Sequence, residues 1–293
     1  MFELEAISNE LRSTITSEIQ RAGIFFSIFS RIKSHNSISE KLNRGDYLKG
    51  KKIQDFIGIR IALYFPDDID PVIAFLRKKF TLDNKDIDLH AEDTFRPKRL
   101  NLVFKLPNNY TIIFNETVSS IYDDRVDPTF EVQIRTLLSE GWHEVEHDLR
   151  YKCKEDWEQH KDLSRALNGI YATLETGEWS MLALFNELSY RNYKNKKWES
   201  MIRNKLRIRI VNRELSLKLS NFFNQNPRIA KEIYKLDRHK FLDILMNSKI
   251  SIPLTFDNLI FILNEILFKN EYLSSIEPQF ISDEIKSGLI IEE

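Results

Sequence analysis

The sequence predicts an α+β fold that is followed by an all-helical region. Before residue 135, short β-prone apolar runs are interrupted by stretches whose apolar residues recur at helical intervals. After about residue 155, only the helical period remains. The chain contains only 8 Gly and 8 Pro among 293 residues, which is typical of a helix-rich protein with short connections. We therefore expect a mixed β-sheet flanked by helices, and after it an all-α domain.

The elements of the first region follow from these two periods. A helix is expected from Ile15 to Ile32, because its apolar residues recur every three or four positions. A second helix is expected over DDIDPVIAFLRKKF, where a proline is tolerated in the first turn. Four strands are expected, at IGIRIALYF (57–65), LNLVFKL (100–106), YTIIF (110–114) and FEVQIRT (130–136).

The helical period returns from Leu137 to Lys152, where the sheet region ends. Leu138, Trp142, Val145 and Leu149 fall on one stripe of this helix, and the stripe is expected to pack against the sheet.

The remainder of the chain reads as further helices, so we expect two domains, at residues 1–155 and 156–293. The clearest helical segments are DLSRALNGIYATLETGEWSMLALFNELSY, LSLKLSNFF, RIAKEIYKLDRHKFLDILM and FDNLIFILNEILFKN. One segment, RNKLRIRIVNRE, alternates basic and apolar residues as a strand does, although its neighbours are helical. Its structure is left open.

The charge and cysteine content exclude some classes of protein. The 43 Lys and Arg residues balance 44 Asp and Glu residues, so no global field attracts the protein to nucleic acid or to an anionic membrane. The single cysteine, Cys153, rules out an internal disulfide and suits a reducing compartment. The N-terminus does not resemble a signal peptide, and no apolar run reaches membrane-spanning length. We expect a cytoplasmic protein without membrane contact.

The string His-Glu-x-x-His at residues 143–147 suggests a zinc metalloprotease. On a helix, His143 and His147 lie one turn apart, with Glu144 as the general base. A catalytic zinc needs a third protein ligand, and only Glu175 or Glu178 is offered for it. The simpler interpretation is a structural helix in which Glu146 pairs with Arg150.

Charged residues around the predicted strands favour a nucleotide site instead. A cluster of cations precedes the strand at residue 57, and it indicates either a triphosphate site or a solvated helix face. Asp55 lies just before that strand, and Arg60 lies inside it. Glu131 and Arg135 lie in the strand at residues 130–136. If these strands are neighbours, Asp55 and Glu131 can hold one Mg²⁺ ion, and salt bridges to nearby lysines are the competing interpretation.

Four ordered motifs resemble the synthetase domain of the RelA/SpoT family over roughly residues 25–153. They are R-x-K-x-x-x-S-x-x-x-K from Arg31, D-x-x-G-x-R from Asp55, E-x-Q-x-R-T from Glu131 and W-x-E-x-E-H-x-x-x-Y-K from Trp142. The resemblance implies a nucleotidyltransferase-like fold and an enzyme that moves the β,γ-pyrophosphate of ATP to the 3′-hydroxyl of GDP or GTP. It also allows a homo-oligomer, and the sequence does not indicate the number of subunits.

The resemblance assigns a role to each motif residue. Arg31 and Arg60 would clamp the adenine ring, and Arg60 would also act in catalysis. The phosphates would be bound by Lys33, Ser37 and Lys41. Asp55 and Glu131 would bind Mg²⁺ and carry the chemistry. The acceptor side would be lined or braced by Gln133, Arg135, His147 and Lys152. Lys98 and Arg99 lie in a stretch that departs from the family pattern, where they either contact phosphates on the acceptor side or belong to a solvated loop.

The acceptor loop departs from the family pattern G-Y-x-S-x-H, whose tyrosine stacks on guanine. Here the corresponding stretch is DTFRPKRLNLVF, with Pro97 at the tyrosine position, Arg99 at the serine and Asn101 at the histidine. Phe95 or Tyr110 would have to stack on the base instead.

This departure leaves two alternatives open. The first is a toxic small alarmone synthetase that modifies the 3′ CCA end of tRNA or adenosine nucleotides. Residues 190–218 carry ten Lys and Arg with Tyr190, Tyr193 and Trp198 among them, which suits an RNA surface or a solvated helix face. The second is an inactive protein that senses nucleotides. Only 30 residues precede Arg31, so no N-terminal alarmone hydrolase is expected.

Overall fold

The computed structural model describes residues 2–43, 45–87, 100–211 and 214–290. The chain forms two compact units. Unit 1 comprises Met1–Ser17, Phe26–Ile69 and Leu76–Glu178, and unit 2 comprises Glu18–Phe25, Asp70–Phe75 and Trp179–Glu293. These are units of packing, and one long helix continues through residue 178. The division into domains 1–155 and 156–293 therefore stays a prediction.

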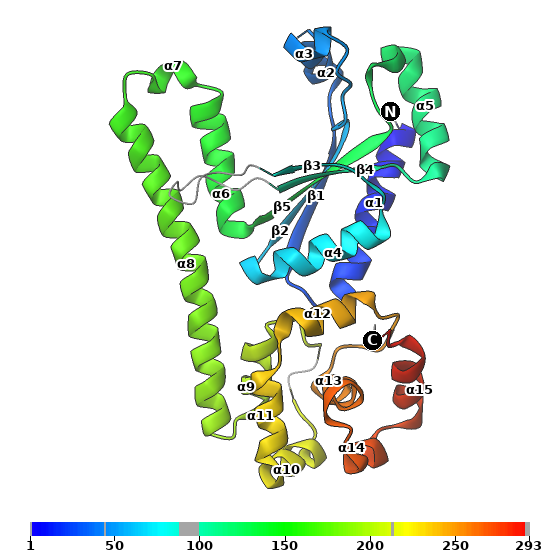
Figure 1. Ribbon diagram of the computed structural model, residues 1–293, viewed down its shortest axis with the longest axis vertical. Helices are drawn as coiled ribbons and strands as arrows, with labels where there is room; N and C mark the ends of the chain where they lie inside the picture. The colour runs from blue at the N-terminus through cyan, green and yellow to red at the C-terminus, as the bar shows by residue number, and fades with distance from the viewer. Residues whose placement is uncertain (1, 44, 88–99, 212–213, 291–293) are drawn as a thin grey trace. The chain divides into compact units, whose positions relative to one another are not determined.

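A mixed sheet forms the centre of unit 1, which confirms the expected α+β class. Within the described residues, five strands pair in the order β1-β2-β5-β4-β3, with β2 parallel to β5 and the other neighbours antiparallel. Helices flank this sheet (Figure 1). The strands are β1 (Phe26–Ile32), β2 (Ile57–Leu63), β3 (Leu82–Ile87), β4 (Leu100–Lys105) and β5 (Thr129–Thr136).

Alternation along the two central strands separates an apolar face from a polar one. Ile57, Ile59 and Ile61 of β2 are buried, and so are Phe130, Val132 and Ile134 of β5. Successive strand residues point to opposite faces. The residues between these apolar positions therefore share the other face, and this is the face on which the polar motif residues lie.

The helix expected from Ile15 to Ile32 is wrong beyond Arg21. Helix α1 (Phe2–Arg21) ends before Gly23, which has a left-handed φ of 74°. This conformation favours glycine and commonly stops a helix. Residues Phe26–Ile32 then form β1, because their alternation fits one more strand beside β2.

The strand expected at YTIIF is also wrong, since this segment lies in helix α5 (Asn108–Tyr122). Phe114, Val118 and Tyr122 recur every four residues and are buried, so the apolar spacing over the longer window is helical. The structure instead adds β3, whose sequence LDNKDI is polar. This strand lies at the edge of the sheet, where an apolar pattern is not required.

The helix expected over residues 137–152 is present as α6 (Leu137–Glu146) and a π-helical turn, η3 (His147–Tyr151). The predicted packing stripe is wrong, because Leu138, Val145 and Leu149 are exposed. The buried apolar residue is Trp142. Its indole N–H donates to the carbonyl of Leu167 at 3.2 Å, and its ring packs on Tyr171 of α8 (Lys161–Lys194).

The later segments are helical, as predicted. They form α9 (Trp198–Leu206), α10 (Leu217–Gln225), α11 (Pro227–Lys235), α12 (Arg238–Asn247), α13 (Phe256–Leu263), η4 (Asn264–Phe268), α14 (Glu271–Ile276) and α15 (Gln279–Gly288). The ambiguous segment RNKLRIRIVNRE completes α9, which ends before Arg207 in a left-handed conformation. Residues 207–211 are not a strand, and residues 212–213 lie outside the described part.

The remaining elements connect the sheet to these helices. They are α2 (His35–Leu42), α3 (Gly45–Leu48), η1 (Pro66–Asp68), α4 (Ile69–Lys79), η2 (Asp123–Arg125) and α7 (Lys154–Trp157). Helix α4 has Pro71 in its first turn, as expected. Among the described helices, none combines the length and the apolar character needed to cross a membrane.

Candidate active site

An open cavity of about 770 Å³ lies on the polar face of the sheet in unit 1. Its walls come from β1, α2, β2, β4, β5, α6 and η3. It contains every predicted site residue that the structure describes. These are Arg31, Lys33, Ser37, Lys41, Asp55, Arg60, Glu131, Gln133, Arg135, His147 and Lys152. The predicted acceptor residues Lys98 and Arg99 lie outside the described residues.

Strand register explains why motifs distant in sequence meet in this cavity. Arg31 of β1 pairs with Gly58 of β2, and Gly58 pairs with Glu131 of β5. Two residues further along these strands, Arg60 pairs with Gln133, and Gln133 pairs with Asn101 of β4. Because residues paired across a sheet share a face, these two rows of pairs place the polar side chains together.

Gly58 leaves room for the first of the proposed clamp residues. A Cβ atom at this position would meet the Arg31 side chain at 3.7 Å (Cγ) and 3.9 Å (Nε), which is ordinary contact distance. The Arg31 side chain therefore lies across Gly58.

Asp55 is bound by two lysines from the first motif. Lys33 ion-pairs with its carboxylate, and Lys41 of α2 lies 2.9 and 3.0 Å from its two oxygens. Burial raises the pKa of Asp55, but the positive charges of Lys33 and Lys41 outweigh it and hold that pKa below its usual range. The salt bridges considered as the competing interpretation thus form, within the same cavity.

Glu131 has the opposite electrostatic environment. Burial raises the pKa of Glu131, and the negative charge of Asp55 raises it further. The Gln133 amide donates to a Glu131 oxygen at 2.9 Å and steadies the carboxylate. Two carboxylates that disfavour each other's charge are a fit for a divalent cation, which would relieve the repulsion. Among the described residues, no group of three or more His, Cys, Asp or Glu side chains is arranged to hold a metal ion.

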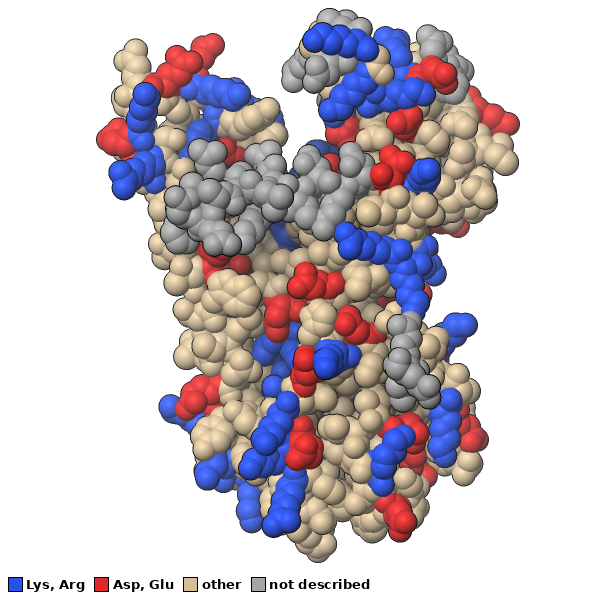
Figure 2. All heavy atoms as spheres, viewed as in Figure 1, with Lys and Arg blue, Asp and Glu red and all other residues tan. Residues whose placement is uncertain are grey.

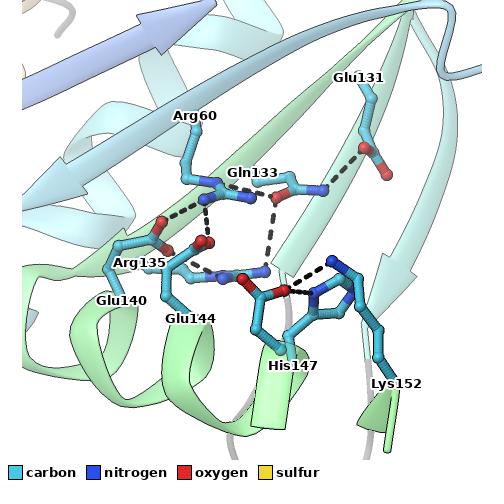
Figure 3. Close-up of polar contacts among 9 residues, drawn as sticks. Arg60, Glu131, Gln133, Arg135, Glu140, Glu144, His147 and Lys152 are labelled. Carbon is cyan, nitrogen blue, oxygen red and sulfur yellow. Dashed lines mark hydrogen bonds and ion pairs between the residues drawn. The ribbon is translucent and has the colours of Figure 1, made fainter. Parts of the chain in front are cut away.

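Arg60 is held at its edge by three acceptors. Its Nε donates to Oε1 of Gln133 at 3.3 Å, and its Nη1 ion-pairs with Glu140 and Glu144 of α6 (Figure 3). Arg135 extends this network, because its Nη1 donates to the other oxygen of Glu140 at 2.8 Å. The guanidinium of Arg60 is therefore fixed in orientation by two different elements, β5 and α6.

Sequence reasoning missed the role of the two glutamates. Glu140 and Glu144 lie one turn apart on α6, so both reach the same neighbour. The signal was a pair of acids on a helix that directly follows a strand carrying arginine. This signal does not indicate that the partner of the two acids is Arg60, which is 80 residues from Glu140 in the chain.

The two histidines of the zinc motif line the cavity in a row of rings. His143 and His147 have centroids 5.8 Å apart, and His147 stacks on Tyr151 at 5.6 Å (14° between planes). The His147 Nδ1 and the Lys152 ammonium both contact Asp148, at 3.0 and 2.7 Å. Glu144, the general base of the protease interpretation, ion-pairs with Arg60. The alternative pairing of Glu146 with Arg150 is confirmed at 3.3 Å.

The acceptor side is described only in part. Residues 93–99, including Phe95 and Pro97, lie outside the described residues. Asn101 lines the cavity, and its buried Oδ1 has no hydrogen-bond partner in the described part of the chain. Tyr110, the other residue considered for stacking, is not in the cavity wall, because it lies on α5 with its hydroxyl bonded to Glu10 of α1.

The basic segment at residues 190–218 differs from a surface built for stacking bases. Trp198 is 2% exposed and its indole N–H donates to Asn224 at 2.9 Å. Tyr193 stacks on Tyr234 with centroids 5.9 Å apart. Two of the three aromatic residues considered for RNA contact therefore pack inside unit 2.

Comparison with known proteins agrees with the motifs. Residues 30–156 match the family described as the region found in RelA / SpoT proteins. The chain is 33% identical over 156 residues to the GTP pyrophosphokinase YjbM of Bacillus subtilis, covering 51% of this chain and 67% of that protein. It is 31% identical over 136 residues to YwaC, a GTP pyrophosphokinase of the same organism, covering 43% of this chain and 59% of that protein.

The chain is also similar to solved structures. The crystal structure of small alarmone synthetase 1 from Bacillus subtilis is 25% identical with a TM-score of 0.47, covering 63% of this chain and 93% of that one. The family match and the identity to YjbM, over two thirds of its length, carry the assignment. The chain belongs to the RelA/SpoT family.

Proposed function

We propose that this protein transfers the β,γ-pyrophosphate of ATP to the 3′-hydroxyl of GDP or GTP, forming (p)ppGpp. One observation carries the proposal. A single cavity gathers cations from the first motif around two carboxylates from the second and third, with a fixed arginine beside them. The names of YjbM and YwaC as GTP pyrophosphokinases support guanosine nucleotides as the acceptor.

The donor nucleotide is proposed to bind along the β1–β2 side of the cavity. The guanidinium planes of Arg31 and Arg60 provide flat, charged faces for the adenine ring, which lysine cannot supply. Lys33, Ser37 and Lys41 follow on the same wall and present ammonium and hydroxyl donors to the phosphates. Lysine and arginine side chains also gather over α2 and α3 (Figure 2), where Lys49, Lys51 and Lys52 are exposed.

We propose that Asp55 and Glu131 hold Mg²⁺, since their pair of carboxylates fits the number that this ion usually takes from a protein. When bound, the ion would neutralise charge on the phosphate oxygens. Removal of divalent cations with EDTA should then abolish turnover, and added Mg²⁺ should restore it.

The chemical step requires a nucleophile and a stabilised leaving group. The 3′-oxygen of the acceptor attacks the β-phosphorus of ATP, and the bond from that phosphorus to the oxygen bridging the α-phosphate breaks to release AMP. The Glu131 carboxylate accepts the proton of the hydroxyl, with Gln133 holding it in place. Lys33 and Lys41 remain beside Asp55 and stabilise the charge that spreads over the phosphoryl oxygens.

The remaining motif residues are proposed to brace the acceptor side. Arg135 fixes Glu140, and Lys152 and His147 share Asp148 on the opposite wall. Lys98 and Arg99 keep their proposed role as phosphate contacts. We further propose that residues 156–293 regulate the enzyme or select its substrate, and that the reaction takes place in the cytoplasm, where its nucleotides are found.

The test is to incubate the protein with Mg²⁺ and ATP labelled in the γ-phosphate, offering GDP, GTP, ATP and bulk tRNA in separate reactions. Label on GDP or GTP, with AMP released, is the expected result. Label on tRNA or on an adenosine nucleotide would instead identify the toxic branch of the family. No transfer to any acceptor would overturn the proposal and favour a nucleotide-sensing protein.

A further inference from the structure

The two glutamates that hold Arg60 are not equivalent. Glu140 uses both oxygens, one for Arg60 at 2.5 Å and the other for Arg135 at 2.8 Å, and its side chain is 13% exposed. Glu144 ion-pairs with Arg60 through Oε1 only, and its side chain is 51% exposed. Its other oxygen accepts no hydrogen bond from the residues that the structure describes. Glu140 is therefore structural, while Glu144 has an acceptor to offer in the cavity.

The position of this acceptor follows from guanidinium geometry. Hydrogen bonds to a guanidinium lie in its plane, so Gln133, Glu140 and Glu144 occupy the edge of Arg60. These three bonds leave the flat faces of the guanidinium uncovered. A ring stacked on such a face has the Glu144 carboxylate at its rim, on the α6 side of the cavity.

From this arrangement we infer that Glu144 selects the base of the donor nucleotide. Its second carboxylate oxygen accepts a hydrogen bond from the 6-amino group of an adenine stacked on Arg60, and it repels the 6-oxo group of hypoxanthine or guanine. The inference rests on the proposed function, because it takes Arg60 as the surface on which the donor base stacks.

The chemistry of the carboxylate explains the discrimination. An ionised carboxylate only accepts hydrogen bonds, so it complements an amino group and opposes a carbonyl. A site that places a polar group against the wrong partner leaves both of them unsatisfied. Glutamine has nearly the same shape, but its amide both donates and accepts, so it would tolerate either base.

The experiment compares ATP with ITP, whose hypoxanthine base carries a 6-oxo group and a proton on N1 in place of the 6-amino group and the unprotonated N1 of adenine. The ratio of kcat/KM for the two donors is measured for the wild type, for Glu144→Gln and for the control Glu40→Gln. Glu40 lines the phosphate side of the same cavity from α2, so the control removes the same charge from a different wall. We expect the preference for ATP to fall about tenfold in Glu144→Gln, the scale of one lost polar discrimination, and to persist in Glu40→Gln.

A parallel loss of activity on both donors, with an unchanged ratio, would overturn the inference and leave Glu144 a residue that only positions Arg60. If no donor is turned over, the affinities for non-hydrolysable analogues of ATP and ITP give the same ratio by calorimetry. A ratio that changes in Glu144→Gln without any turnover supports the inference while the proposed function fails. Binding of neither analogue overturns both.

Discussion

Two basic segments of this chain look alike in sequence and differ in structure. Residues 31–52 and 190–218 are both rich in lysine and arginine. In the first, Lys33 and Lys41 converge on Asp55 at a cavity. In the second, Trp198 is buried in the core of unit 2, Tyr193 stacks on Tyr234, and Lys205 lies over the Tyr234 ring at 5.8 Å. Basic residues indicate a site where they lie beside carboxylates at the ends of strands. A run of basic residues on helices is not enough to indicate a site.

The first test of this difference removes the Trp198 side chain. The side chain is buried in unit 2, so Trp198→Ala should lower the free energy of unfolding by about 3–5 kcal/mol, the usual cost of deleting a buried aromatic residue. Denaturant unfolding measures it. Trp179→Ala is the control, because Trp179 is 57% exposed and its loss should cost little. A Trp198→Ala protein of normal stability that no longer binds tRNA would contradict a structural role.

The second test removes a carboxylate from the first segment's cavity. Asp55→Asn should lower kcat by about 10²–10³-fold, the scale of removing one electrostatic contact from a transition state. Its fold should persist, which circular dichroism checks. Asp124→Asn, an exposed acid on η2 outside the cavity wall, should leave kcat unchanged. Equal kcat values for Asp55→Asn and wild type would show that Asp55 has no role in catalysis.

The third test sharpens the contrast between compensated and uncompensated buried acids. Asp55 has two lysines, whereas Glu178 of α8 is buried beside Thr136, and burial, reinforced by the nearby Glu175, raises its pKa. A raised carboxyl pKa stabilises the fold at low pH, and this contribution is lost as pH rises through the folded pKa. Glu178→Gln should therefore be more stable than wild type at pH 7 by about 0.5–2 kcal/mol, the common range for such stabilising changes.

The gain from Glu178→Gln should shrink towards pH 4, near the ordinary carboxyl pKa of about 4.3. Thermal melts of both proteins across this pH range measure the difference. Glu187→Gln is the control, since Glu187 is exposed and pairs with Arg191 at the helix surface. A constant difference between pH 4 and pH 7 would show that the Glu178 charge has no cost in the folded state.

The motif residues were predictable because they stand out from their local background. Arg60 is a charged residue in an otherwise apolar strand, and Glu131 lies between the apolar residues Phe130 and Val132; charged residues in such places need partners. The strands β2 and β5 themselves follow from apolar alternation. Lys33 and Asp55 are 22 residues apart, and they meet because Lys33 follows β1 and Asp55 precedes β2, its antiparallel neighbour.

What escaped prediction depends on context beyond a short window. Strand β1 was merged into a helix because Phe26 and Phe29 also fit the helical period, and only Gly23 marks the break. The polar edge strand β3 carries no apolar signal. The bond from Glu144 to Arg60 joins residues 84 apart in sequence, and it forms only because the sheet and α6 meet at one cavity wall.

In the proposed reaction, pyrophosphate leaves ATP as one unit in this cavity. The most direct measurement runs parallel reactions with ATP labelled in the β-phosphate and in the γ-phosphate, with GDP as acceptor, and follows both labels and the adenosine product. If pyrophosphate is transferred as one unit, both labels appear on the acceptor in equal amounts and AMP forms in the same amount. Transfer of the γ label alone, with ADP as the product, would contradict it.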